Sequence, residues 1–264
     1  MMHIILLRGL AREAAHWHSF PEQLKAALGA QCQLHLIDFP GCGQYHQRPA
    51  LHSIDAMTNH ARNEDNIPAA LASGEPVFII GISMGGMVAL DWAQRFPQEI
   101  NGIVLINSSS GDQPLFWRLQ PAAWPNVLLA LLLPVRQREA RVLRMVTNDY
   151  AAYSKNLQHW LDIQQRRPIT RLTILKMLRA AANFRPCKEC SVKGLVLTSC
   201  GDRMVLPRAS EAIAEKFQWP LVAHPQAGHD LPMDDTRWVV QEIQQWITSW
   251  QDGDNCPVSF IYKV

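Results

Sequence analysis

A serine stands between two glycines in residues 77–90, which read VFIIGISMGGMVAL. The apolar run before Gly81 predicts a buried strand, and the apolar spacing from Met84 onward predicts a helix. Ser83 would then lie at the apex of a tight strand-to-helix turn, which strains its backbone and exposes its hydroxyl. That position makes Ser83 a candidate nucleophile. The alternative is an ordinary turn in which the serine caps the helix.

A serine hydroxyl needs a base within hydrogen-bond reach, and the base needs an acid to orient it. In a parallel α/β sheet such groups gather at the carboxyl ends of the strands. Asp202 follows a predicted strand at Gly194–Thr198, and His229 lies in the loop after a predicted strand at Leu221–Ala223. We therefore expect His229 to be the base and Asp202 its partner.

Each of these residues has a competing interpretation. Asp202 could simply cap the helix that follows it. His224 is the nearest competitor as base, but it lies at the strand end and is expected to be structural. Asp230 could compete as the acid, although an immediate neighbour of His229 on the chain usually points the wrong way.

A tetrahedral intermediate also needs two donors for its oxyanion. The residue after the nucleophile, Met84, is expected to supply one backbone N–H. The loop after the first predicted strand contains Arg8, Gly9 and Leu10, and the N–H of Leu10 is the second candidate. Gly9 would let the backbone approach the serine closely.

Strand and helix patterns alternate along most of the chain, which predicts a mostly parallel sheet with helices on both faces. The predicted strands are His3–Leu7, Gln33–Phe39, Val77–Ile80, Ile103–Ile106, Gly194–Thr198 and Leu221–Ala223. The predicted helices are Phe20–Leu28, Ile54–Ala72 (bent or ended early by Pro68), Met84–Arg95, Arg208–Phe217 and Thr236–Trp250.

The alternation breaks between residues 112 and 186, where the pattern is helical and interrupted by prolines. We predict a core of residues 1–111 and 187–250, a helical cap inserted at 112–186, and a tail at 251–264 with no assigned role. The insertion holds twelve Lys and Arg against four Asp and Glu, so its net charge is +8 while the remainder carries −6. The candidate substrate contacts are Trp17, Trp117, Trp124 and Trp160. The alternative is a cap packed on itself, with its arginines on a solvated face.

Taken together, these motifs resemble the α/β-hydrolase superfamily, whose members share the order Ser, Asp, His. The residues concerned are Leu7–Leu10 with Trp17, Asp38–Gly43, Gly81–Gly86, Gly201–Asp202 and Gly228–His229. The resemblance implies an eight-stranded, mostly parallel sheet with a cap over the site. It also implies that Ser83 is the nucleophile, His229 the base and Asp202 its partner.

Two positions bear on this resemblance. Arg8 stands where His-Gly is usual, so the oxyanion loop must be supported differently. Some members place the acid after the strand that precedes the cap, but Asn107 and Ser108 occupy that place here, which favours Asp202. The cap also resembles that of the acyl-carrier-protein methyl ester esterases of biotin synthesis, which implies that a basic cap could meet an acidic carrier protein.

Composition excludes several other classes. The chain has 264 residues and a net charge of only +2, which argues against nucleic-acid binding. The longest apolar stretch, Val127–Val135, is too short to span a bilayer, and the lack of a signal peptide favours a cytoplasmic location. Six cysteines form no regular framework, and the Cys187–Cys190 pair lacks the second ligand pair of a zinc site. We expect no metal and no cofactor.

The sequence thus predicts a serine hydrolase that cleaves a carboxylic ester or thioester of a small to medium acyl substrate through an acyl-enzyme. A lyase or C–C hydrolase resembling the menaquinone-pathway members of the superfamily stays open, because such enzymes keep the same triad. An acyl-carrier-protein methyl ester esterase is a further alternative. A non-catalytic ligand binder is the third class.

Overall fold

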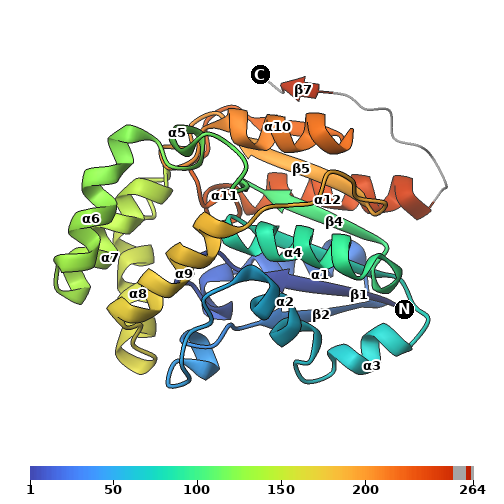
Figure 1. The fold of residues 1–264 in the computed structure, drawn as a ribbon, viewed down its shortest axis with the longest axis horizontal. Helices are drawn as coiled ribbons and strands as arrows, with labels where there is room; N and C mark the ends of the chain where they lie inside the picture. The colour runs from blue at the N-terminus through green and yellow to red at the C-terminus, as the bar shows by residue number, and fades with distance from the viewer. Residues whose placement is uncertain (252–259, 263–264) are drawn as a thin grey trace.

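The computed structural model describes residues 1–251 and 260–262 of the chain, and a parallel β-sheet runs through its centre (Figure 1). The strands are β1 (Met2–Leu7), β2 (Cys32–Ile37), β3 (Val77–Ile82), β4 (Gly102–Ile106), β5 (Lys193–Ser199), β6 (Leu221–His224) and β7 (Phe260–Tyr262). The helices are α1 (Phe20–Leu28), α2 (Ile54–Arg62), α3 (Ile67–Ala72), α4 (Met84–Arg95), α5 (Leu115–Arg118), α6 (Trp124–Leu132), α7 (Val135–Val146), α8 (Tyr153–Arg166), α9 (Arg171–Asn183), α10 (Pro207–Phe217), α11 (Leu231–Asp234) and α12 (Thr236–Gln251).

The order of the strands decides where a site can form. Neighbouring strands follow the order β2-β1-β3-β4-β5-β6-β7, and all of the pairs are parallel. The chain therefore moves from β1 to one edge and returns to the other side of β1 as β3. At such a reversal the loops after the two strands diverge and leave a crevice at their carboxyl ends. Here those loops hold Gly9 and Ser83.

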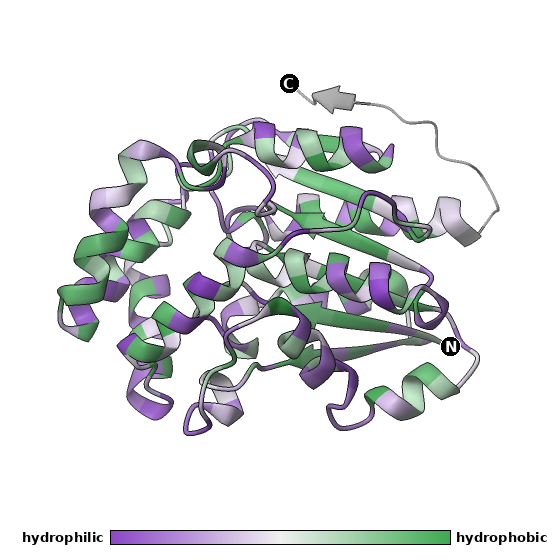
Figure 2. Ribbon diagram, in the orientation of Figure 1, coloured by the Kyte–Doolittle hydropathy of each residue, from purple (hydrophilic) through white to green (hydrophobic). Residues whose placement is uncertain are grey.

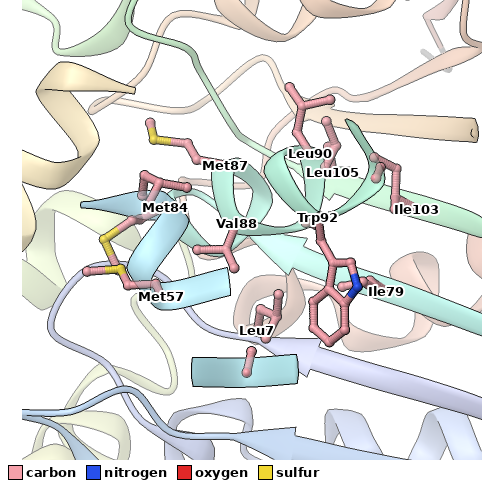
Figure 3. Close-up of a cluster of buried hydrophobic side chains, with 14 of the residues drawn as sticks. Leu7, Met57, Ile79, Met84, Met87, Val88, Leu90, Trp92, Ile103 and Leu105 are labelled. Atoms are coloured by element: carbon pink, nitrogen blue, oxygen red, sulfur yellow. The ribbon is translucent and has the colours of Figure 1, made fainter. Parts of the chain in front are cut away.

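Alternate residues of the central strands feed two separate cores, because successive side chains point to opposite faces. Ile5 and Leu7 join α2, α4 and α10 on one face, whereas Ile4 and Leu6 join α1 and α12 on the other. Burial on both faces explains why β1, β3 and β4 are almost continuously apolar, as the green strands of Figure 2 show. Figure 3 shows α4 packing Val88 and Trp92 toward Leu7 and Ile79 in the first of these cores.

The observed elements agree with the predicted ones to within two residues, with one exception. The single helix predicted over Ile54–Ala72 is wrong, because α2 ends at Arg62 and α3 begins at Ile67. Pro68 does not end a helix but lies in the first turn of α3, where its missing N–H costs nothing. The break comes earlier, at Asn66, whose φ of 69° is left-handed.

The fold class is an α/β sheet protein with helices on both faces, as predicted. The eight strands implied by the resemblance are not found: the described residues form seven, of which β7 extends the β6 edge. Residues 252–259 of the predicted tail lie outside the described part of the chain. Helices α5–α9 leave the sheet after β4 and return at β5, and α6–α9 gather at one end of the molecule (Figure 1). Among residues 1–251 and 260–262, no helix is both long and apolar enough to cross a membrane.

Candidate active site

Ser83 lies at the turn between β3 and α4 in a backbone conformation that non-glycine residues rarely adopt, with φ 55° and ψ −120°. Two glycines make this turn possible. A Cβ on Gly81 would come within 2.4 Å of the carbonyl oxygen of Gly85, and a Cβ on Gly85 within 2.1 Å of that of Leu7. The turn is also anchored to the next strand, because Ser83 N–H donates to the carbonyl of Ile106 at 2.9 Å.

His229 and Asp202 are brought together although 27 residues separate them, with His229 Nδ1 2.7 Å from Asp202 Oδ2. Both side chains are buried. The other carboxylate oxygen, Oδ1, accepts from the backbone N–H groups of Met204 at 2.7 Å and Val205 at 3.0 Å. One carboxylate oxygen of Asp202 therefore holds its own turn and the other contacts the histidine. The competing interpretation, that Asp202 caps the following helix, is wrong, because Leu206 is the N-cap residue of that helix, α10.

The environment of His229 favours its protonated form. Burial alone would lower the pKa of the imidazole, but the charge of Asp202 and the hydrogen bond to it outweigh that effect. The pKa of His229 is thus raised above its ordinary value of 6.5. The raised pKa means that the neutral imidazole of His229 binds a proton more strongly than a free imidazole does.

The two competitors are engaged elsewhere. His224 Nδ1 accepts from the backbone of Gln226 and Ala227, and its Nε2 lies 3.3 Å from Asp235 Oδ2, so this histidine holds a turn. Asp230 points away from His229 toward another partner, described next.

Arg8 and Asp230 form a buried ion pair that joins the loop after β1 to the loop that carries His229. Arg8 Nη1 and Nη2 donate to the two carboxylate oxygens at 3.1 and 2.5 Å, and both side chains are about 95% or more buried. The guanidinium also lies 4.8 Å from the ring centre of Trp17. The Arg8 charge lowers the pKa of Asp230, although burial alone would raise it. Because Arg8 stands where His-Gly is usual, the sequence predicts a different support for the loop after β1, and the ion pair with Asp230 provides it.

The predicted oxyanion donors lie against Ser83. Met84 is the first residue of α4, so its N–H has no acceptor within the helix. A Cβ on Gly9 would lie 3.2 Å from the Cβ of Ser83, which shows how closely the Arg8–Leu10 loop passes the serine. Leu10 and Met84 both line the cavity described below. The arrangement fits an oxyanion hole, and that role stays a prediction.

Ser83 and His229 line one cavity of about 270 Å³, which lies between the sheet edge and the inserted helices. Most of its wall is apolar, with side chains such as Val142, Met145 and Ile174. Space of this size suits an acyl chain better than a large rigid ligand.

Of the four tryptophans predicted to contact substrate, only Trp160 lines this cavity. Trp17 is buried in the other core, stacked on Phe20. Trp117 packs beside Arg208, and the indole of half-exposed Trp124 donates to the carbonyl of Leu119. Trp17, Trp117 and Trp124 thus do not line the cavity that contains Ser83 and His229.

Sequence reasoning missed the residue that ties three loops together. Asn107, left-handed at φ 45°, donates through Nδ2 to Ser199 Oγ at 3.0 Å and to the carbonyl of His229 at 2.9 Å. Its Oδ1 accepts from Ser199 N–H at 2.9 Å. The sequence does carry a signal for this role. Asn107 is a polar side chain directly after an apolar strand, at the carboxyl edge of the sheet.

The inserted helices also hold the two loops directly. Gln120 Nε2 donates to the carbonyl of Asp202 at 2.6 Å, and Asp230 N–H donates to the carbonyl of Val146 at 2.8 Å. Asp234 accepts from both Asn148 N–H and Gly228 N–H, at 2.8 and 2.7 Å. A shift of these helices would therefore move Asp202 and His229.

Nothing in the described residues groups three or more His, Cys, Asp or Glu side chains as a metal site would require. The Cys187 and Cys190 thiols are free in the structure, the first of them exposed.

Residues 4–242 match the family model described as the alpha/beta hydrolase family. The chain belongs to that family. The resemblance drawn from its motifs is thus confirmed, and the family places the chain among hydrolases.

Curated relatives of this chain include esterases. It is 24% identical over 245 residues to the pimeloyl-[acyl-carrier protein] methyl ester esterase of Chromobacterium violaceum, covering 91% of this chain and 81% of that protein. The protein of the same name from Citrobacter koseri is 26% identical over 190 residues, or 72% of this chain. The second match spans only 63% of its relative's length.

Solved structures with the same fold include an esterase from Exiguobacterium antarcticum, with a TM-score of 0.76 at 13% identity, covering 94% of this chain and 92% of that chain. A thermophilic esterase from Thermogutta terrifontis gives 0.72 at 20% identity, covering 94% and 90%. The type II thioesterase BorB of the borrelidin biosynthetic cluster gives 0.63 at 20%, covering 92% and 91%. At these identities the likeness concerns the fold.

Asp202→Asn is expected to lower the pH at which activity appears. The base works only when neutral, so kcat/KM should rise with pH through the pKa of His229, which lies above 6.5 in the native protein. Removing the carboxylate charge removes the main stabilisation of the imidazolium, so the midpoint should fall while kcat drops about 10⁴-fold. The pH profile of ester hydrolysis measures both. Asp65→Asn, at an exposed position, is the control, and an unchanged midpoint in Asp202→Asn would contradict the assignment.

Proposed function

We propose that this chain is a serine hydrolase that cleaves carboxylic esters or thioesters through an acyl-enzyme. The observation that carries the proposal is the buried His229–Asp202 hydrogen bond beside a cavity that also contains Ser83. Neither a turn serine nor a structural histidine requires that combination. Because Nδ1 of His229 is engaged with Asp202, Nε2 is the ring nitrogen that stays available to the cavity.

The reaction has two halves. In the first, Ser83 Oγ attacks the substrate carbonyl carbon while its proton passes to Nε2 of His229, and the oxyanion accepts from the N–H groups of Leu10 and Met84. The tetrahedral intermediate then expels the alcohol or thiol, which takes the proton from His229. In the second half, water attacks the acyl-serine with the same base, which releases the acid and restores Ser83. Asp202 stays ionised and holds the imidazole in the required tautomer.

The relatives favour ester cleavage over the other reactions of this fold. A lyase or C–C hydrolase would keep the same three residues, so the site itself does not separate them. Both curated relatives are named as esterases, and the structural neighbours include esterases and a thioesterase. A non-catalytic binder is disfavoured because a buried, oriented His–Asp pair serves no purpose in binding an apolar ligand.

Ser83→Ala is expected to abolish turnover of short p-nitrophenyl esters, with kcat reduced by about 10⁴-fold or more, because no other group can form the acyl-enzyme. The variant should still fold, because alanine removes only the hydroxyl oxygen at the cavity and leaves the backbone of the turn unchanged. Ser154→Ala, at an exposed position on α8, is the matched control. Residual activity of Ser83→Ala near the wild-type level would refute the proposal.

A second candidate is an esterase that acts on an acyl chain carried by an acidic carrier protein. Its support is the name of the curated relatives together with the charge of the inserted helices. Arg136 and Arg171 are exposed on α7 and α9, and Arg171 donates to the carbonyl of Leu132. This part of the surface also exposes Leu132 and Leu172. A basic surface with apolar centres suits an acidic protein partner.

Charge reversal tests this second candidate. Arg136→Glu with Arg171→Glu should lower kcat/KM about tenfold for a methyl ester attached to an acidic acyl carrier protein, because the encounter loses its electrostatic attraction. The same ester free in solution should be hydrolysed as before. Lys25→Glu, exposed on α1, reverses a charge away from this surface. Equal loss on both substrates, or no loss on either, would contradict carrier recognition.

A further inference from the structure

Five polar or charged residues of the cavity wall contact one another and have no role in the proposed reaction. They are Arg12, Arg138, Glu139, Trp160 and Gln164, and we call them the polar niche. Arg12 follows the oxyanion loop, and the other four lie on α7 and α8. Apolar side chains make up most of the remaining wall, so this cluster gives an acyl cavity one polar end.

Gln164 offers two hydrogen-bond donors that nothing in the protein uses. Its Oε1 accepts from Arg138 Nη2 at 2.8 Å and from Ile169 N–H at 3.2 Å, which fixes the orientation of the amide. Its Nε2 is buried and, within the described part of the chain, has no partner. A buried amide without a partner destabilises the protein, because it has lost its hydrogen bonds to water. Such a group calls for an explanation, and a ligand that accepts from it is one.

Trp160 adds a second unused donor four residues away on the same helix. Its side chain is fully buried, and its indole Nε1 also lacks a partner among the described residues. The guanidinium of Arg12 lies 4.0 Å from the ring centre, so a cation–π contact with Trp160 stabilises that charge in the cavity wall. Glu139 Oε2 also lacks a hydrogen bond from any described residue, but it lies 3.2 Å from the Arg12 guanidinium and forms an ion pair with it. The two groups of the niche that the described part of the molecule leaves without any partner of opposite charge or polarity are N–H donors, which calls for an oxygen acceptor rather than a cation.

The charges of the niche are also unbalanced. Glu139 is shared between Arg138, whose Nε donates to Oε1 at 2.9 Å, and Arg12, whose Nη1 lies 3.2 Å from Oε2. Two guanidinium groups thus face one carboxylate, which leaves one positive charge over. Elsewhere in this wall, buried Arg8 is neutralised by Asp230, and half-buried Arg118 donates to the carbonyls of Ala181 and Ala182. Burial, together with the neighbouring arginines, lowers the pKa of Arg12 despite Glu139.

We infer that the polar niche binds a carboxylate at the far end of the acyl chain, so that the substrate is an ester or thioester of a dicarboxylic acid with its second carboxyl group free. Such a group would accept from Gln164 Nε2 and Trp160 Nε1 and neutralise the extra charge beside Arg12. The inference rests on the proposed ester hydrolysis and names the substrate class of that site.

The position of the niche limits the length of the chain. Arg12 is two residues beyond Leu10, so their Cα atoms are at most about 7 Å apart. Both residues line the same cavity, so an acyl group held at the oxyanion donors begins in the space that the niche borders. In this arrangement the far end of the acyl chain stays inside the protein. An acyl chain whose far end is attached to a carrier protein would instead have to extend out of the cavity.

The competing explanation is structural: the niche could serve only to hold α7 and α8 against the loop after β1. That role accounts for the Arg12–Glu139 and Arg138–Gln164 contacts. It does not account for two buried donors without a partner in residues 1–251 and 260–262, both on residues that line the cavity, nor for the extra positive charge.

The test compares three series of p-nitrophenyl esters with six to nine carbons: acyl chains ending in a free carboxylate, in a methyl ester, and in a methyl group. The wild-type protein should favour the free carboxylate over both others by about tenfold in kcat/KM at the best length. A preference for the methyl ester would mean that the niche takes a neutral oxygen acceptor, and equal rates or a preference for the methyl group would mean that it takes none. Either outcome overturns the inference, while Ser83-dependent hydrolysis of the neutral esters would leave the proposed function standing.

Gln164→Glu sharpens the test, because it keeps the oxygen that Arg138 and Ile169 need and replaces the donor with a negative charge. The preference for carboxylate-ended over methyl-ended chains should disappear or reverse. Gln158→Glu makes the same change at an exposed position of α8 and should preserve it. Trp160→Phe, which keeps the ring beside Arg12 and removes the N–H, should reduce the preference several-fold and serves if Gln164→Glu does not fold. An unchanged preference in both niche variants would overturn the inference.

Discussion

The close approach of three backbone segments around Ser83 is the constraint on which the rest of the structure depends. β1, β3 and α4 meet where the strand order reverses, and there is no room for a side chain at Gly81 or Gly85. The contact presses α4 onto the sheet, forces Ser83 to a φ of 55°, and brings the Gly9 loop alongside it. A relaxed turn would point the serine elsewhere and separate it from the loop that contains Gly9.

Buried charge then links this turn to the rest of the site. Arg8 reaches from the loop after β1 to Asp230, immediately beside His229, while Asn107 reaches from the end of β4 to the same loop. A buried ion pair adds little net stability, yet losing one partner leaves an expensive unpaired charge. The pair therefore acts mainly as a constraint on geometry: the oxyanion loop and the histidine loop keep one relative position. The inserted helices add to this through Gln120 and Val146.

Much of the site could be predicted because its residues obey local rules. Glycines at a strand-to-helix turn and polar residues at strand ends mark Ser83, Asp202 and His229 whatever the tertiary structure. The partner of Arg8 could not be predicted, since Asp230 is 222 residues away and only folding pairs them. Which of the four tryptophans lines the cavity could not be predicted for a related reason. A large apolar ring looks the same in a sequence whether it lines a cavity, as Trp160 does, or fills a core, as Trp17 does.

The break between α2 and α3 illustrates the limit of a single residue type as a signal. The sequence predicts an interruption at Pro68, but proline is compatible with a first helical turn, and the chain turns at Asn66 instead. The polar niche was likewise hidden, because Gln164 and Arg138 read as surface residues of amphipathic helices until the packing of α7 and α8 buried them. For Pro68, Gln164 and Arg138 alike, the residue type can be read from the sequence, but the environment of the side chain depends on the tertiary structure.

The central claim is that Ser83 is a nucleophile activated by His229 and Asp202. Its most direct measurement is the reaction of the folded protein with a fluorophosphonate, followed by mass spectrometry of the intact chain and of its peptides. The account predicts one adduct per chain, on Ser83, forming at least a hundredfold more slowly in His229→Ala. A folded protein that does not react, or an adduct on another residue, would contradict it.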